Sequence, residues 1–338
     1  MKIYSLSEDL DLVVIGSGPA GLAALHAAQE AGLNAIAIDK GPVCGALLAH
    51  PTYMRWFSTF DKLELAGFPM TVSEKNPTRR EYLKYCRTFA RYFGLRIVTY
   101  CAVTEIEPGK AGFTIVGQDR FGRTYTWTAR NVIVATGFYD SPRMLGIPGE
   151  DLPHVSHYYR EAHGYADHDV LVIGAGSSAA EAALELYREG ARVTVAMREQ
   201  AFQTKYWLEP DIENRIAEGS IACHRGVDVV EIRPDEAELE AHTGGRITVP
   251  AEFLLAMTGF EPDTTLIESA SAVVDRETGK PELTEALETT VPGMYVAGTL
   301  CAGKEANAVF VENGREHGPR IVADIVKKRK DGGPKTRQ

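Results

Sequence analysis

Two stretches of the chain repeat one order of apolar and polar residues. The first, "LDLVVIGSGPAGLAALHAAQEAGLNAIAIDKG", begins at Leu10, and the second, "DHDVLVIGAGSSAAEAALELYREGARVTVAMRE", begins at Asp167. In each, a short apolar run leads into a glycine turn, an amphipathic stretch and a second apolar run. Short continuous apolar runs are typical of parallel strands buried on both faces. Each stretch therefore predicts a strand, a turn, a helix and a second strand.

The first glycine turn has the spacing of a dinucleotide-binding motif. Gly16, Gly18 and Gly21 follow the apolar run at residues 12–15, and the predicted helix ends near Gly32. The first glycine permits a tight turn, the second lets a pyrophosphate approach the backbone, and the third lets the helix pack against the strand. Asp39 follows the second apolar run, where a carboxylate can bind the ribose hydroxyls.

The second glycine turn differs at two positions. Gly174 and Gly176 are followed by Ala179 in place of a third glycine, and the predicted helix ends near Gly190. The next strand ends in Arg198, where the first turn has an acid. An acid would repel a 2′-phosphate, whereas arginine binds one through charged hydrogen bonds. The pattern favours NADPH, although an arginine in an ordinary exposed loop would look the same.

The remainder of each half also repeats. Both halves continue with strand patterns joined by glycine-containing turns and end in T-G-F, at residues 136–138 and 258–260. A further segment, "TTVPGMYVAGTLCAG", has an apolar strand but no glycine turn ahead of it. We expect this segment to return to the first domain. The predicted fold is α/β, with two Rossmann-like three-layer domains: residues 1–148 and 262–338 form one, and residues 149–261 form a second that is inserted into it.

Composition excludes several other classes of protein. The 338 residues are 44% hydrophobic and carry a formal charge of −10, which disfavours a nucleic-acid-binding surface. The first residues include acids and no long apolar core, and no apolar run reaches membrane-spanning length. The five cysteines are scattered, with no C-x-x-C and no metal-ligand motif. A cytoplasmic protein without a metal site is expected.

Motif order gives a resemblance to a known group. G-S-G-P-A-G, V-A-T-G, G-A-G-S-S-A and V-P-G-M-Y-V-A-G follow the order found in flavoproteins with two dinucleotide-binding domains. The long stretches "HPTYMRWFSTFDKLELAGFPM", "HYYREAHGYADHDVLVIG" and "AGKEANAVFVENGREHG" resemble the YpdA-type bacillithiol disulfide reductase family. The resemblance implies FAD in the first domain, NADPH in the second, a small-molecule disulfide or redox protein as electron acceptor, and a homo-oligomer. Without a C-x-x-C, the chain is not a standard thioredoxin reductase.

The motifs and the resemblance together assign candidate cofactor residues. For FAD these are Gly16, Gly18, Pro19, Ala20, Gly21, Asp39, Lys40, Thr136, Gly137, Gly298, Asn307 and Asn313. For NADPH they are Gly174, Gly176, Ser177, Ser178, Ala179, Arg198, Thr258 and Gly259.

The catalytic groups are less well defined. Many members of the resembled family have a cysteine where this chain has Ala20, so the natural candidate for thiol chemistry is absent. Cys44 and Cys301 are candidate thiols near the flavin, although free cysteines are more often buried packing residues. His50 is a candidate proton donor. A flavin monooxygenase-like enzyme and a ferredoxin-type NADP reductase remain as alternative functions.

Overall fold

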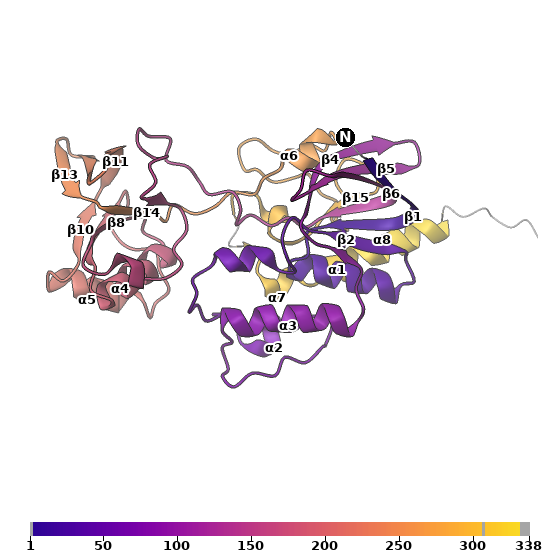
Figure 1. Ribbon diagram of the computed structural model, residues 1–338, viewed down its shortest axis with the longest axis horizontal. Helices are drawn as coiled ribbons and strands as arrows, with labels where there is room; N and C mark the ends of the chain where they lie inside the picture. Colours follow the sequence, from indigo (N-terminus) through magenta and orange to yellow (C-terminus); the bar gives the residue numbers. More distant parts are fainter. Residues whose placement is uncertain (1–2, 306–307, 332–338) are drawn as a thin grey trace, which may run out of the picture. The chain divides into compact units, whose positions relative to one another are not determined.

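The computed structural model describes residues 3–305 and 308–331, which form two compact units (Figure 1). The first unit comprises residues 1–48, 54–141 and 260–338, and the second comprises residues 49–53 and 142–259. The chain thus passes between the units after residues 48, 53, 141 and 259, whereas we expected boundaries after 148 and 261 alone. Residues 142–148 belong to the second unit because Leu145 and Ile147 pack in its core, and Ile232 N–H donates to Pro148 O at 2.9 Å.

The first unit is built on a parallel sheet in the order β3-β2-β1-β6, with β15 beside the carboxyl half of β6. Its opposite edge continues as the antiparallel meander β6-β5-β4. The strands are β1 (Ile3–Ile15), β2 (Ala35–Ile38), β3 (Ile97–Val98), β4 (Cys101–Gly109), β5 (Gly112–Asp119), β6 (Thr124–Val134) and β15 (Met294–Val296). The helices are α1 (Pro19–Glu30), α2 (Phe60–Leu63), α3 (Arg79–Tyr92), α6 (Thr265–Ser269), α7 (Val311–Gly314) and α8 (His317–Asp331), with 3₁₀ turns η1 (Gly45–Ala49) and η3 (Gly298–Ala302).

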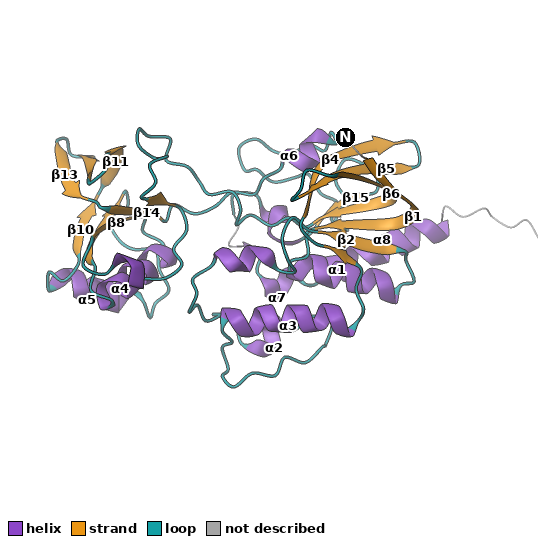
Figure 2. Cartoon of the chain, viewed as in Figure 1, coloured by secondary structure: helices purple, strands orange, loops and turns teal. Residues whose placement is uncertain are grey.

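Alternating residues of β1 contribute to two of the cores of the first unit. Leu12 and Val14 pack under the helical layer with α1 and α8, whereas Val13 and Ile15 face the core shared with the meander. All four side chains are buried, which explains why the run shows no polar alternation. Figure 2 shows α1 and α8 along one face of the orange strands. Two details were not expected: β1 begins at Ile3, and β6 is one continuous strand.

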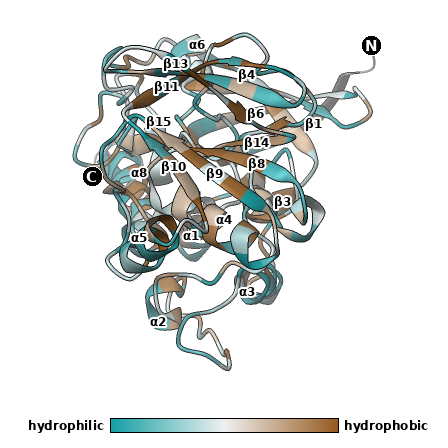
Figure 3. Ribbon diagram, turned by 90° about the vertical axis from the view of Figure 1, so that its left-hand side faces the viewer, coloured by the Kyte–Doolittle hydropathy of each residue, from teal (hydrophilic) through white to brown (hydrophobic). Residues whose placement is uncertain are grey.

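The second unit repeats this plan. Its parallel sheet has the order β10-β9-β8-β14-β7, and a separate antiparallel sheet has the order β11-β12-β13. The central strands carry much of the brown of apolar residues in Figure 3. The elements are β7 (Val155–Ser156), η2 (His163–Tyr165), β8 (Asp169–Ile173), α4 (Ser177–Arg188), β9 (Arg192–Met197), α5 (Glu209–Ala217), β10 (Ala222–Arg225), β11 (Val227–Ile232), β12 (Glu236–Ala241), β13 (Arg246–Pro250) and β14 (Phe253–Ala256).

Residues of β8 again alternate between two cores. Val170 and Val172 pack with α4, and Leu171 and Ile173 pack against the small antiparallel sheet. The predicted fold class, two Rossmann-like α/β domains, is confirmed. Within the described ranges, every helix falls short of the length or apolar character that a bilayer crossing requires.

Candidate functional site

The first glycine turn leaves an open surface at its centre. Gly16 has φ +101°, and a Cβ added there would lie 2.4 Å from the carbonyl oxygen of Ala135. A Cβ at Gly21 would lie 2.0 Å from the carbonyl oxygen of Gly16, so α1 can start close to β1 only with glycine at this position. At Gly18, by contrast, an added Cβ meets no atom within 4 Å. This surface fits a pyrophosphate, because Gly18 also offers no side chain to cap the first N–H groups of α1.

Asp39 fastens the glycine turn through one of its carboxylate oxygens and its own loop through the other. One carboxylate oxygen accepts hydrogen bonds from Ser17 N–H at 2.6 Å and from the Ser17 hydroxyl at 2.7 Å. The other accepts the Gly41 N–H at 2.8 Å. A carboxylate has about four acceptor positions, so room for a ribose hydroxyl remains. Ser17 is fully buried and was missed from the sequence, because it occupies an unspecified position of the motif.

The carboxyl end of β6 lies beside this turn and supplies a free polar atom. Thr136 Oγ1 is buried and has no hydrogen-bond partner among the described residues. A buried hydroxyl is normally paired, so Thr136 fits a ligand atom at this strand end. The neighbouring Gly137 has φ +77°. Lys40 forms an exposed ion pair with Asp140 at 3.0 Å, so its amine is already engaged by protein.

The 3₁₀ turn η3 closes the first site from the other end of the chain. Gly298 has φ +76°, and a Cβ added there would lie 3.2 Å from the Cβ of Ala20. The Gly298 N–H donates to His317 Nδ1 at 3.1 Å. Burial lowers the pKa of His317, and the charge of Arg320 lowers it further, so the imidazole stays neutral and accepts this bond. His317 was missed because no sequence motif surrounds it.

Of the two asparagine candidates, the structure describes only Asn313. Asn313 bonds within its own loop: its Oδ1 accepts the Phe310 N–H at 2.8 Å, and its amide nitrogen donates to Ala308 O at 2.9 Å. Its side chain therefore holds the start of α7 and is already committed. Asn307 lies outside the described residues.

The second glycine turn has the same open centre. Gly174 has φ +130°, and a Cβ there would lie 2.6 Å from the carbonyl oxygen of Met257. The Cβ of Ala179, which is fully buried, lies 3.4 Å from that position, so alanine fits where the motif has its third glycine. A Cβ at Gly176 meets nothing within 4 Å. The turn therefore fits a second pyrophosphate.

Arg198 and the loop at Lys205 flank the second turn. Arg198 is exposed directly after β9 and has no carboxylate partner in the described part of the chain. Lys205 N–H donates to the Ser177 hydroxyl at 3.3 Å, and its amine lies 3.5 Å from Glu181. The first turn of α4 also includes the candidate Ser178. An unpaired guanidinium here is available to a 2′-phosphate.

The end of β14 also closes the second turn. The Thr258 hydroxyl donates to Arg143 O at 2.7 Å, and Arg143 N–H donates to Gly259 O at 2.9 Å. Gly259 has φ +90°. These bonds fix the T-G pair, and they leave the Thr258 hydroxyl engaged with backbone.

Of the candidate thiols, Cys44 is buried in a core and Cys301 is half-buried against one. The thiol of Cys44 donates to Ser17 O at 3.5 Å. Its hydrogen bond with Cys86 and, to a smaller extent, its burial raise the pKa of Cys44 well above the usual range. Burial raises the pKa of Cys301 to about 12, and its thiol donates to Val296 O at 3.3 Å. A redox thiol needs an exposed, easily ionised sulfur, so neither environment favours that role. His50 lies in the second unit.

Comparisons with known proteins agree with this geometry. The family model described as "Pyridine nucleotide-disulphide oxidoreductase" matches residues 13–298. Bacilliredoxin reductase Bdr of Bacillus subtilis is 36% identical over 319 residues, covering 94% of this chain and 97% of that protein. The structure of bacillithiol disulfide reductase Bdr (YpdA) from Bacillus cereus superposes with a TM-score of 0.93 at 35% identity, covering 95% of this chain and 100% of that one. The corresponding Staphylococcus aureus structure gives 0.89 at 31% identity, covering 95% and 99%.

These findings confirm the predicted enzyme class and cofactors. The resemblance to YpdA-type reductases is confirmed. The family match indicates an oxidoreductase that uses FAD and NADP(H). The chain therefore belongs to the pyridine nucleotide-disulphide oxidoreductase family.

Proposed function

We propose that this protein is an NADPH-dependent FAD enzyme that reduces a low-molecular-weight disulfide of the bacillithiol type. The observation that supports this most directly is the pair of glycine turns, each open at its second glycine. Two relatives whose names specify bacillithiol disulfide reductase share 31% and 35% identity across almost the whole chain. The overall reaction converts NADPH, one proton and the disulfide into NADP⁺ and two thiols.

The first unit would hold FAD. The N–H groups at the start of α1 face the pyrophosphate, Asp39 receives a ribose hydroxyl, and Thr136 Oγ1 gains the partner that it lacks within the protein. Bound FAD would supply two-electron transfer chemistry between the nicotinamide and the disulfide. The expected domain division, with FAD in the first unit, is part of this proposal.

The second unit would hold NADPH. The N-terminal turn of α4, with Ser177 and Ser178, binds the pyrophosphate, and the unpaired Arg198 binds the 2′-phosphate. Lys205 adds a second positive charge near that turn. The preference for NADPH over NADH would come from these charges.

The disulfide would be reduced without a protein thiol. The family cysteine is replaced by Ala20, and the thiols of Cys44 and Cys301 lie in or against a core with raised pKa values. Electrons would pass directly to the bound substrate. This distinguishes the protein from reductases that use a dithiol.

An anaerobic stopped-flow experiment tests the proposal. The purified flavoprotein is bleached with NADPH and then mixed separately with bacillithiol disulfide, oxidised ferredoxin or oxygen. Fast reoxidation by the disulfide, with two thiols released per NADPH, is the expected result. Fast reoxidation by ferredoxin alone, or by oxygen with a peroxyflavin spectrum, would replace it with one of the two alternative functions. Failure of NADPH to bleach the flavin would reject all three.

The location and assembly also belong to this proposal. All five cysteines are free, as is usual in a reducing compartment, which supports the cytoplasm. We expect a homo-oligomer, as the family resemblance implies. Sedimentation velocity of the flavin-loaded protein measures its mass, and a monomer at all concentrations would contradict this expectation.

A further inference from the structure

The outer face of α3 has a continuous row of positive charge. Arg80, Lys84, Arg87 and Arg91 are spaced four, three and four residues apart, and all four are exposed. At 100° per residue they fall on one face of the helix, about 16 Å long, opposite the buried residues Tyr82, Tyr85, Cys86 and Phe89. We call these four residues the basic stripe.

The basic stripe is not neutralised by the protein itself. None of its four residues forms an ion pair with a carboxylate in the part of the chain that the structure describes. The only acid on α3 is Glu81, which is committed to the helix cap: its carboxylate accepts from the Thr78 N–H at 2.7 Å and the Thr78 hydroxyl at 2.8 Å. Like charges three and four residues apart destabilise a helix, so this arrangement is costly to the free protein.

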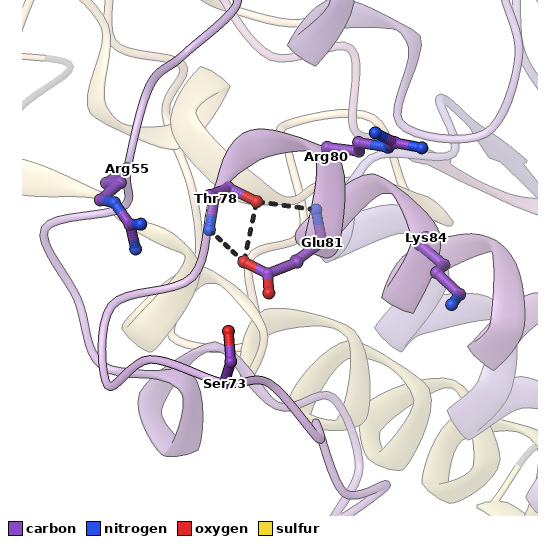
Figure 4. A pocket seen from close by; sticks show the side chains of 6 residues that line it. All are labelled: Arg55, Ser73, Thr78, Arg80, Glu81 and Lys84. Atoms are coloured by element: carbon purple, nitrogen blue, oxygen red, sulfur yellow. Dashed lines mark hydrogen bonds between the residues drawn. The ribbon is translucent and has the colours of Figure 1, made fainter.

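A cavity lies at the start of the stripe. It has a volume of about 410 Å³ and is lined by Arg55, Ser73, Thr78, Arg80, Glu81 and Lys84. Figure 4 shows Arg80 and Lys84 leaving successive turns of α3 on the same side of the helix, with Ser73 below Glu81. Arg55 lies across the cavity and donates to Asn76 O at 3.3 Å. Three cations and one capped carboxylate leave this cavity positively charged.

The charge of the stripe contrasts with the charge of the whole chain. The protein has 46 acidic and 36 basic residues and a formal charge of −10, whereas α3 has five basic residues and one acid. A local cationic row on an acidic protein attracts acidic partners while the rest of the surface repels poorly oriented encounters. The stripe is long enough to contact several carboxylates of a folded protein.

We propose that the basic stripe is a docking surface for an acidic redox protein whose disulfide this enzyme reduces to two thiols with NADPH, and that the adjacent cavity receives one carboxylate side chain of that protein. The redox character of the partner rests on the proposed function, whereas its acidity follows from the stripe. A partner docked here would be selected by charge before any chemistry occurs.

A binding experiment tests the acidity directly. The probe is a fluorescein-labelled peptide with an internal disulfide flanked by several glutamates, and a glutamine-flanked copy is its control. We expect the flavin-loaded protein to bind the acidic peptide at least about tenfold more tightly at low ionic strength, with the difference vanishing near 1 M salt. Equal affinity for the two peptides would overturn the proposal.

Variants locate the binding. Two variants remove the stripe in steps: Arg87→Gln/Arg91→Gln, and a fourfold variant that adds Arg80→Gln and Lys84→Gln. Glutamine keeps good helix propensity, and the preference for the acidic peptide should fall in the first variant and vanish in the second. Lys327→Gln/Lys330→Gln, which removes two exposed cations from α8, should leave it unchanged. Bound flavin and the thermal midpoint show whether each variant is folded. Loss of the preference in the α8 variant, or its survival in the α3 variants, would also overturn the proposal.

Two further measurements distinguish the docking surface from the proposed function and from a membrane-binding surface. Turnover of the two peptide disulfides with NADPH reports on the redox character of the partner, whereas turnover of bacillithiol disulfide reports on the proposed function. Selective binding without peptide turnover would reject the redox character of the partner and retain the acidic docking surface. Binding of phosphatidylglycerol vesicles that depends on the stripe, without selection between the peptides, would assign the surface to a membrane instead.

Discussion

Arg198 is the exposed side chain that we propose sets the nucleotide preference. It directly follows β9 and has no carboxylate partner among the described residues, beside a glycine turn that fits a pyrophosphate. Arg198→Glu should raise the KM for NADPH at least about tenfold, because a charged hydrogen bond contributes roughly 1.5–3 kcal/mol. The KM for NADH should change little. Steady-state kinetics with both nucleotides measure this, and Arg198→Lys, which keeps the charge, should be intermediate. An unchanged NADPH/NADH ratio would remove Arg198 from the site.

Buried thiols give a second test at the scale of residues. The double variant Cys44→Ser/Cys301→Ser should keep disulfide turnover within about twofold, because both sulfurs lie in or against a core and ionise poorly. NADPH consumption in the presence of the disulfide measures this. A loss of turnover with normal flavin reduction would show that one of the two thiols participates.

His317 makes the first unit sensitive to acid. Its folded pKa is lowered below the ordinary value of 6.5, so the unfolded chain takes up a proton first as pH falls. The free energy of unfolding should therefore decrease as pH falls through 6.5, and level off below the folded pKa. His317→Gln should flatten this decline, as urea titrations across the range would show. His26, whose pKa is also lowered by burial, should keep its own contribution in that variant.

At the scale of elements, α1 and α8 pack closely together at a glycine of α8. A Cβ added at Gly318 would lie 2.4 Å from both N and Cα of Ala24. Gly318→Ala should lower the free energy of unfolding by about 1–3 kcal/mol, because backbone must move to admit the methyl group. Denaturant titration followed by flavin fluorescence measures this. Gly109→Ala, where the nearest atom would be 3.5 Å away, is the matched control and should change stability by less than about 0.5 kcal/mol.

The elements that the sequence predicted well are those determined by local pattern. The strand–turn–helix segments at Gly16 and Gly174 follow from apolar runs and glycine spacing. The carbonyl oxygens that exclude a Cβ at these two glycines belong to Ala135 and Met257, which are distant in sequence. The contact of His317 with Gly298 joins the first residues of α8 and η3, which are 19 positions apart, and no sequence periodicity links the two elements. The engagement of Asp39 by Ser17 was hidden for a similar reason: the carboxylate was expected to serve only the ligand.

For the molecule as a whole, the two glycine turns should act separately. Gly176→Asp should abolish flavin reduction by NADPH while the purified protein stays yellow, because the added carboxylate occupies only the second turn. Gly18→Asp should give protein without flavin. Absorbance spectra before and after NADPH addition distinguish these results. Loss of the yellow colour in Gly176→Asp would show that the cofactors are not divided between the units as proposed.

The interleaved order of the two units along the chain has a consequence for dissection of the protein. Because β15 pairs with β6, a single protease cut after Ser141 would leave the N-terminal and C-terminal fragments hydrogen-bonded to each other in the parallel sheet. Residues 142–259 made alone would lack Thr52, whose N–H donates to Arg160 O at 2.7 Å. The two fragments should therefore co-purify. A version of the second unit made alone needs residues 49–53 joined to residues 142–259.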